Sequence, residues 1–188
     1  MSLWTQLKES LGERRLKMRK DPRSKPAMAN FATARSVALL YREKGEGFYI
    51  LVKQYVKFLK AELGIREVLA LSYIEDHKDI PHYHLHRLRY DYFTSKNLDF
   101  FMEPTGEEVE RFVEKDYDIL IDLEKDPSLP LRYVLRMSKA RLKVGHYSEA
   151  YEHLYDLMIR CDERATFDEY IKQVNHYLRK INSHEERA

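Results

Sequence analysis

The sequence of 188 residues has one cysteine, Cys161, and no long apolar run. A single cysteine excludes a disulfide within the chain, and scarce cysteine is typical of a reducing compartment. No stretch approaches the roughly 18 consecutive apolar residues of a bilayer-spanning helix. The N-terminus also lacks the continuous apolar segment of a secretory signal. These absences predict a cytoplasmic protein with no transmembrane segment.

The sequence also lacks the common catalytic signatures. Its six glycines form neither a G-x-G-x-x-G fingerprint nor a phosphate-binding G-K-[ST] loop, and there is no G-x-S-x-G nucleophile elbow. Residues 42–47, REKGEG, contain two glycines, but Glu43 and Glu46 would repel a phosphate. Cys161 ends an apolar run, where a cysteine is more often a small buried residue than a nucleophile. We assign no catalytic residue and no cofactor.

The chain has little net charge, but its charges are unevenly distributed. The formal net charge is +2. The first 25 residues carry eight basic and three acidic side chains, a net +5, which leaves −3 for the remainder. The chain is therefore a near-neutral body with a basic leader, and the body as a whole is not predicted to bind polyanions.

The leader itself predicts a basic amphipathic helix over residues 3–20. Trp4, Leu7 and Leu11 recur at helical spacing, and Asp21-Pro22 ends the pattern. We expect residues 1–30 to form this helix and a linker, and residues 31–188 to form the domain. The helix could pack through its Trp4, Leu7 and Leu11 face, lie on a membrane surface, or bind RNA, the ribosome or an acidic protein. The candidate partner-binding residues are Arg14, Arg15, Lys17, Arg19 and Lys20.

The body alternates apolar strand-length runs with helical patterns. Residues 36–41 (SVALLY) and 67–74 (EVLALSYI) read as buried strands flanking a helix over 48–63, and residues 117–147 repeat the strand–helix–strand unit with short connections. Such repetition indicates a parallel sheet covered by helices on both faces. We predict an α/β, Rossmann-like, doubly wound and mostly parallel sheet of five or six strands.

Two capping boxes mark further helix starts. The first, at residues 105–108 (TGEE), predicts a helix to about Lys115. The second, at residues 166–169 (TFDE), predicts an amphipathic helix to Ile181. The buried side of this last helix is predicted to carry Phe167, Tyr170, Ile171, Val174, Tyr177, Leu178 and Ile181.

The candidate ligand site follows from the fold class. Open parallel sheets bind ligands outside the carboxyl ends of their strands, near the switch in strand order. The residues at and just after the ends of the two strands within residues 117–147 are therefore candidate ligand-binding residues: Asp122, Glu124, Ser128, Gly145 and His146. The alternative is that Asp122 caps a turn, as aspartate commonly does beside proline-containing turns. No third metal ligand follows from the spacing of these carboxylates, so we predict no metal.

Residues 82–86 contain three alternating histidines. We expect an extended segment from about residue 84 to residue 93. If the histidines are also in extended backbone, His82, His84 and His86 point to one side and could bind zinc. Zinc sites usually draw ligands from more than one element, and no cysteine or carboxylate is obviously placed. We favour a histidine-rich segment without metal.

Two families resemble this chain. Residues 31–181, with FTSKNLDF at 93–100 and IDLEKDPSLPLRYV at 121–134, resemble an uncharacterised family of small bacterial α/β proteins without assigned activity. Residues 117–145 resemble the matching segment in the N-terminal half of heptosyltransferase-type GT-B glycosyltransferases. That resemblance implies a Rossmann-like half-fold. It transfers no catalytic residue, and we expect no room for the second, sugar-nucleotide-binding domain in 188 residues.

Two functions compete on this evidence. The first is a non-catalytic binding or adaptor module whose basic helix contacts RNA, the ribosome or an acidic protein. The alternative is a domain or transferase-like enzyme that binds a nucleotide or sugar nucleotide at the strand ends. The sequence does not specify an oligomeric state.

Overall fold

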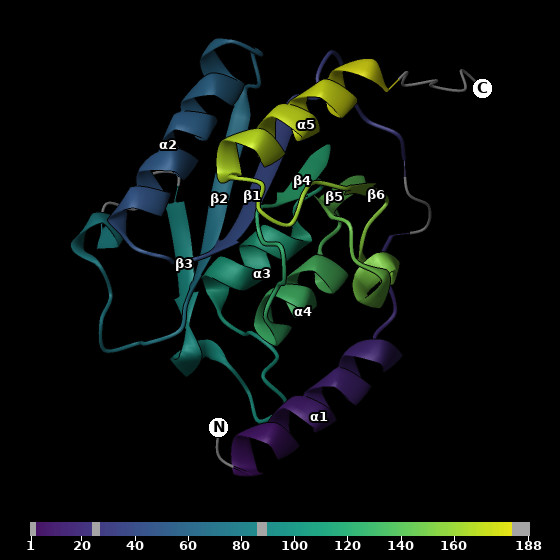
Figure 1. Ribbon diagram of the computed structural model, residues 1–188. Coiled ribbons are helices and arrows are strands. Elements are labelled where there is room, and N and C mark those ends of the chain that lie inside the picture. The colour runs from purple at the N-terminus through teal and green to yellow at the C-terminus, as the bar shows by residue number, and fades with distance from the viewer. Residues whose placement is uncertain (1–2, 24–26, 86–89, 182–188) are drawn as a thin grey trace.

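The computed structural model describes residues 3–23, 27–85 and 90–181. Figure 1 shows its elements. In chain order they are α1 (Leu3–Met18), β1 (Ser36–Arg42), α2 (Glu46–Ala61), β2 (Glu67–Ile74), η1 (His82–Leu85), β3 (Tyr90–Thr94), η2 (Ser95–Asn97), α3 (Glu107–Glu114), β4 (Ile119–Asp122), α4 (Leu129–Met137), β5 (Leu142–His146), η3 (Glu149–Leu154), β6 (Leu157–Ile159) and α5 (Phe167–Lys180). No described helix is long and apolar enough to span a bilayer.

The six strands form one parallel sheet in the order β3-β2-β1-β4-β5-β6. This order confirms the predicted Rossmann-like fold. The chain first builds outward from β1 to β3 and then returns to place β4 on the other side of β1. The switch in strand order therefore lies between β1 and β4, where Leu40 is paired with Asp122. In sheets of this kind the crevice outside that switch is the usual ligand site.

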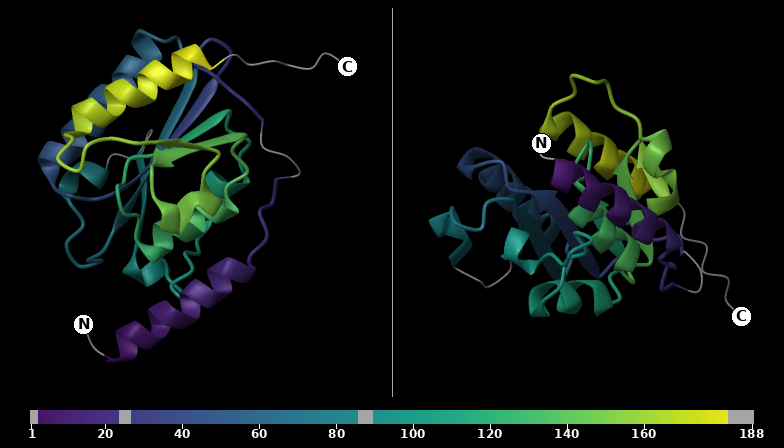
Figure 2. Two further views of the ribbon diagram at one scale, coloured as in Figure 1. Left: turned by 45° about the vertical axis from the view of Figure 1, so that its right-hand side comes forward. Right: turned by 90° about the horizontal axis from the view of Figure 1, so that it is seen from below.

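Helices cover both faces of the sheet, and alternate residues of β1 enter two separate cores. Leu39 and Tyr41 pack in the core under α2 and α5. Ala38 and Leu40 pack in the core under α3 and α4. Figures 1 and 2 show these two helical layers with the sheet between them. Because both faces are covered, the run SVALLY is apolar throughout rather than alternating.

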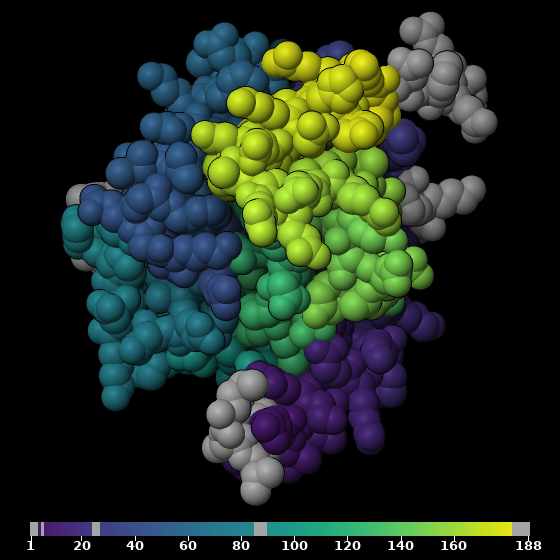
Figure 3. Space-filling model, viewed as in Figure 1, coloured from purple at the N-terminus to yellow at the C-terminus, as the bar shows by residue number. Residues whose placement is uncertain are grey.

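The helix α1 lies at the periphery, along the lower margin of the molecule in Figures 1 and 3. It packs on α4 through Gly12 and Leu16, both buried. A Cβ on Gly12 would lie 2.4 Å from the carbonyl oxygen of Phe101, so only glycine permits this approach. The expected packing face was wrong: Trp4 and Leu7 are exposed.

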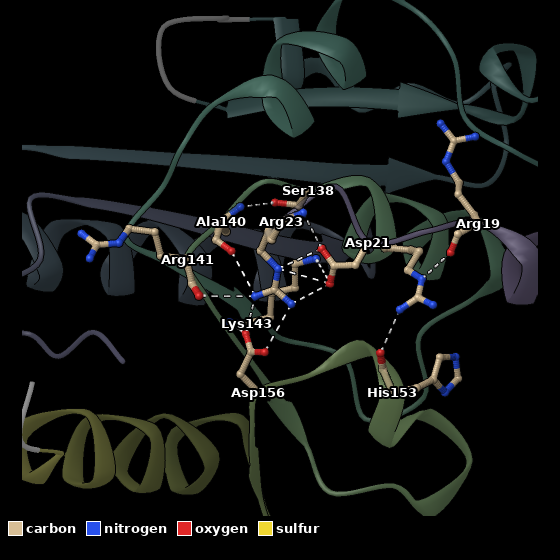
Figure 4. Close-up of polar contacts among 10 residues, drawn as sticks. Arg19, Asp21, Arg23, Ser138, Ala140, Arg141, Lys143, His153 and Asp156 are labelled. Atoms are coloured by element: carbon tan, nitrogen blue, oxygen red, sulfur yellow. Dashed lines mark hydrogen bonds and ion pairs between the residues drawn. The ribbon is translucent and has the colours of Figure 1, made fainter. Parts of the chain in front are cut away.

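An ionic cluster attaches the chain after α1 to β5 (Figure 4). The Arg23 guanidinium lies 2.8 Å from Asp21 Oδ2 and 2.6 Å from Asp156 Oδ2. It also donates to the carbonyl oxygens of Ala140 and Arg141. The buried ammonium of Lys143 lies 3.6 Å from Asp21. These contacts hold the segment that follows the C-terminal end of α1 against the body.

The two predicted capping boxes have different outcomes. Thr166 accepts from the backbone N–H of Glu169, whose carboxylate accepts from Thr166 N–H, so the second box is confirmed. The first is wrong, because Gly106 is the N-cap and the Thr105 hydroxyl donates to the Asn97 carbonyl. On α5, Tyr177 was expected on the buried side but is exposed.

The histidine-rich segment was also predicted with the wrong local structure. His82 and His84 lie in the 3₁₀ turn η1, so the alternation expected of a strand does not apply to them. Instead, His84 is fully buried and its Nε2 pairs with the Glu43 carboxylate. His86 lies outside the described residues. Among the described residues, no group of histidine, cysteine or carboxylate side chains could hold a metal ion.

Candidate functional site

A cavity of about 620 Å³ opens at the carboxyl end of the sheet, beside the switch in strand order. Residues at or just after the carboxyl ends of β1, β2, β4 and β5 line it, together with the start of α5 and one residue of α1. The lining comprises Glu9, Arg42, Lys44, Phe48, Glu75, Leu123, Glu124, Lys125, Asp126, Ser128, His146, Ala165, Thr166, Phe167 and Tyr170.

Three of the predicted ligand-binding residues, Glu124, Ser128 and His146, line this cavity together. The other two support it from below. Asp122 is fully buried, and the backbone of Gly145 lies against the Tyr155 ring, where an added Cβ would approach the ring to 2.3 Å. Glycine at position 145 therefore makes room for Tyr155, whose hydroxyl reaches Asp122.

Asp122 is buried beneath the cavity and accepts hydrogen bonds from three segments that surround it. Its carboxylate accepts from the Tyr155 hydroxyl at 2.6 Å and from the backbone N–H of Glu124 at 3.0 Å. Its carbonyl oxygen accepts from the Tyr170 hydroxyl at 2.9 Å. Burial raises the pKa of Asp122 to about 7, against the opposing effect of its hydrogen bonds. Asp122 thus positions the loop after β4 and the start of α5.

Glu124 joins the loop after β4 to the loop after β1. Its carboxylate accepts from the backbone N–H of Arg42 at 3.0 Å and lies 3.0 Å from the Lys44 ammonium. Lys44 in turn lies over the Phe48 ring, 4.7 Å from its centroid. Glu124 and Lys44 are therefore largely occupied with each other.

Arg42 is the cation in the cavity lining that is available to bind a ligand. Within the described part of the chain, its guanidinium has no hydrogen bond or ion pair, whereas Lys125 donates to the carbonyls of Glu163 and Ala165. Across the cavity, α4 begins after Ser128, whose buried Oγ also has no hydrogen-bond partner there. A helix N-terminus presents unpaired N–H groups and favours negative charge. This part of the cavity suits an anionic group.

Aromatic side chains form the wall nearest α5. The His146 ring stacks on Tyr170 with centroids 3.5 Å apart, and Phe48 meets Phe167 edge to face at 5.3 Å. Burial, aided by the charges of Lys125 and Lys44, lowers the pKa of His146 to about 4. The imidazole is therefore neutral at physiological pH, and the wall suits a planar ring.

A second cavity of about 210 Å³ lies alongside, around the start of α4. It shares Glu9, Glu75, Asp126 and Ser128 with the first. Because Glu9 belongs to α1, the N-terminal helix borders both cavities. These three carboxylates form no ion pair with another described residue, so the rim next to α1 is acidic.

The predicted partner-binding residues of α1 divide into two groups. Arg15 and Arg19 form ion pairs with Glu103, at 3.0 Å and 2.6 Å, so they hold α1 in place. Arg14, Lys17 and Lys20 are exposed, and none forms an ion pair among the described residues.

Sequence reasoning missed Arg42, Phe48, Phe167 and Glu9 as lining residues. The first two lie at the end of β1 and at the start of α2, where the strand-end rule for parallel sheets also applies. The loop after β1 was set aside because it lacks a phosphate-binding glycine pattern, although Arg42, Lys44 and Phe48 all line the cavity. No local signal marks Phe167 or Glu9, since only packing brings α5 and α1 to this edge.

The molecule is thus a single Rossmann-like α/β domain with a polar crevice at its topological switch. The chain belongs to a family of unknown function (DUF6913), whose model matches residues 8–181. This confirms the resemblance to an uncharacterised family.

Two solved structures of E. coli heptosyltransferase WaaC resemble the fold. The structure with ADP matches with 13% identity and a TM-score of 0.42, over 79% of this chain and 47% of that chain. The structure with ADP-2-deoxy-2-fluoro heptose matches with 13% identity and a TM-score of 0.41, over 75% and 47%. The chain thus spans about half the length of that enzyme, which is of the type that residues 117–145 resemble. No curated protein matched the chain.

Proposed function

We propose that this domain binds a small anionic ligand with a planar ring, a nucleotide or sugar nucleotide, in the crevice between β1 and β4. The observation that carries this proposal is the pairing of unlike walls in one cavity. Arg42 and the N–H groups at the start of α4 supply hydrogen-bond donors for an anionic group, and His146, Phe48 and Phe167 form an aromatic side. A ligand with both a phosphate and a base uses both walls at once.

The acidic rim next to α1 is a third feature of the cavity that selects the ligand. Carboxylates such as Glu75 and Asp126 accept hydrogen bonds from hydroxyl groups, as a carboxylate does for the ribose in dinucleotide-binding folds. They also repel a ligand that is anionic along its whole length. The crevice therefore favours a ligand with one charged end and a sugar over a bare polyphosphate. The single cysteine is the reason for placing this function in the cytoplasm.

The adaptor hypothesis for α1 ranks second. Two of its five candidate cations, Arg15 and Arg19, already pair with Glu103. Contact with RNA, the ribosome or an acidic protein would depend on Arg14, Lys17 and Lys20. Co-sedimentation with ribosomes and RNA at about 50 and 300 mM salt tests it, because phosphate contacts weaken steeply with salt.

Thermal denaturation with a ligand panel tests the crevice. We expect ADP, UDP or UDP-glucose to raise Tm by mass action, and adenosine or inorganic pyrophosphate alone to raise it less. Arg42→Gln should weaken the effective ligand by about tenfold or more, the loss typical of a hydrogen bond to a charged group. Arg66→Gln, an exposed arginine before β2, is the matched control.

Two outcomes contradict the proposal. Either no member of the panel shifts Tm, or Arg42→Gln binds the effective ligand as tightly as the unaltered protein. Isothermal titration of the same variants measures the affinity directly and separates binding from a change in fold stability.

A further inference from the structure

Large apolar side chains gather on the outward side of α1. Eight large hydrophobic side chains are exposed among the described residues, and four of them lie on α1 or beside it. The exposed fractions are 59% for Trp4, 47% for Leu7, 76% for Met18 and 43% for Phe100. Scattered exposed apolar residues are ordinary, but a concentration on one element indicates an interaction surface.

These side chains and the partly exposed Leu11 lie on one side of α1. At 3.6 residues per turn, Trp4, Leu7, Leu11 and Met18 fall within an arc of about 60°. The buried residues Gly12 and Leu16 occupy a different side of the helix. The stripe continues onto the neighbouring loop, because Phe100 meets Trp4 edge to face with centroids 5.9 Å apart.

Basic side chains border the stripe. On the helical wheel, Lys8 and Arg14 lie on either side of it. The Lys8 ammonium is 6.0 Å from the Trp4 ring centroid and 5.4 Å from that of Phe100. Arg14 and Lys17 are exposed without an ion pair among the described residues. The leader carries a net charge of +5 whereas the rest of the chain carries −3.

We infer that the outward stripe of α1, with Trp4, Leu7, Leu11, Met18 and Phe100, docks on the surface of an anionic lipid bilayer. An apolar helix face bordered by cations and carrying a tryptophan is the composition of an interfacial helix. The helix lies along the lower margin of the molecule (Figure 3). A nucleic acid would use the cations and stack on the two rings, but it has no counterpart for Leu7, Leu11 and Met18. This inference does not depend on the ligand in the crevice.

The single tryptophan makes the test specific to this surface, because Trp4 is the sole source of indole fluorescence. The full chain is mixed with vesicles of phosphatidylcholine, or of about two parts phosphatidylcholine to one part phosphatidylglycerol. We expect a blue shift of the Trp4 emission with the anionic vesicles. Binding to them should be about tenfold or more tighter than to phosphatidylcholine, and weaker at about 300 mM than at 50 mM salt.

Leu7→Glu is the decisive variant and Tyr177→Glu its matched control, since both positions are exposed on helices and α5 lies away from α1. Leu7→Glu should weaken vesicle binding by about tenfold or more, since a buried charge is costly at the interface. Tyr177→Glu should leave it unchanged.

Four results would each overturn the inference. The first is no blue shift with anionic vesicles, and the second is equal binding to both compositions. The third is an equal loss of binding in Leu7→Glu and Tyr177→Glu. The fourth is a blue shift that grows with protein concentration without lipid, which would assign the stripe to a second copy of the chain. Quenching of Trp4 by single-stranded RNA without any vesicle binding would assign the surface to nucleic acid instead.

Discussion

Tyr155 donates a 2.6 Å hydrogen bond to the carboxylate of Asp122, and this contact connects the end of β4 to the segment before β6. Asp122 ends β4, and Tyr155 precedes β6. The ring of Tyr155 passes over Gly145, on the strand between them. The contact therefore lies beneath the crevice that three neighbouring strands build, and its protonation state bears on the stability of the site.

Asp122→Asn should flatten part of the pH dependence of stability. Burial raises the pKa of Asp122 from 3.8 to about 7, so its stabilising contribution is full below pH 3.8 and is lost as pH rises to about 7. A rise of the Asp122 pKa from 3.8 to about 7 corresponds to ~4 kcal/mol in the free energy of unfolding. Urea denaturation between pH 4 and 8 measures the difference between the variant and the unaltered protein.

The exposed residue Asp79 provides the control for that experiment. Asp79→Asn should leave the profile parallel to that of the unaltered protein. If Asp122→Asn also gives a parallel profile, the raised pKa of Asp122 is wrong.

Removing the charge of Arg23 should destabilise the protein more than removing the charge of Lys143. Arg23→Met leaves the carboxylates of Asp21 and Asp156 without their main partner, and we expect a loss of about 3 kcal/mol or more. Burial, together with the charge of Arg23, lowers the pKa of Lys143 to about 8, so its charged form is held at a cost. Lys143→Met should therefore change the free energy of unfolding by less than about 1 kcal/mol at pH 7. Chemical denaturation measures both, and equal losses would contradict the difference in roles.

Gly12→Ala should destabilise the packing of α1 although alanine is the better helix former. The new Cβ would lie 2.4 Å from the Phe101 carbonyl oxygen and 2.7 Å from Leu129, so we expect a loss of about 1–3 kcal/mol. In contrast, Gly47 lies in α2 with no atom within 4 Å of an added Cβ. Gly47→Ala should stabilise by up to about 1 kcal/mol. Trypsin should cleave after Lys17 faster in Gly12→Ala than in Gly47→Ala or the unaltered protein, because α1 has lost its contact with the body. Cleavage at the same rate in all three proteins would contradict this packing.

His146 should stay neutral well below the usual pH of histidine protonation. Because burial lowers its pKa to about 4, the neutral ring contributes stability that is complete above pH 6.5 and is lost as pH falls towards 4. An NMR titration of the imidazole measures this directly. His146→Phe keeps an aromatic ring stacked on Tyr170. As the pH falls, the free energy of unfolding of this variant should decrease less than that of the unaltered protein. A midpoint near 6.5 would contradict the burial of the ring.

Much of the fold could be predicted from local patterns. The runs SVALLY and EVLALSYI are apolar over the length of a strand, and helical spacing separates them, so a parallel sheet with two covered faces follows from the chain alone. The strand-end rule also selected Glu124, Ser128 and His146, which line one cavity. The second capping box was readable because its hydrogen bonds are local.

By itself, then, the sequence determined the fold class and the strand ends where a site could lie, since these depend on periodicity and on contacts between near neighbours. The tertiary structure decided which residues come together at those strand ends. It set the strand order that places Arg42 across from the start of α4, and it brought Glu9 and Phe167 to the same cavity. It also decided which side of α1 is buried, because the close approach of Gly12 to Phe101 and the ion pairs of Arg15 and Arg19 with Glu103 join segments far apart in the chain. Such contacts leave no periodic signal, and so the apolar stripe with Trp4 and Leu7 faces outward.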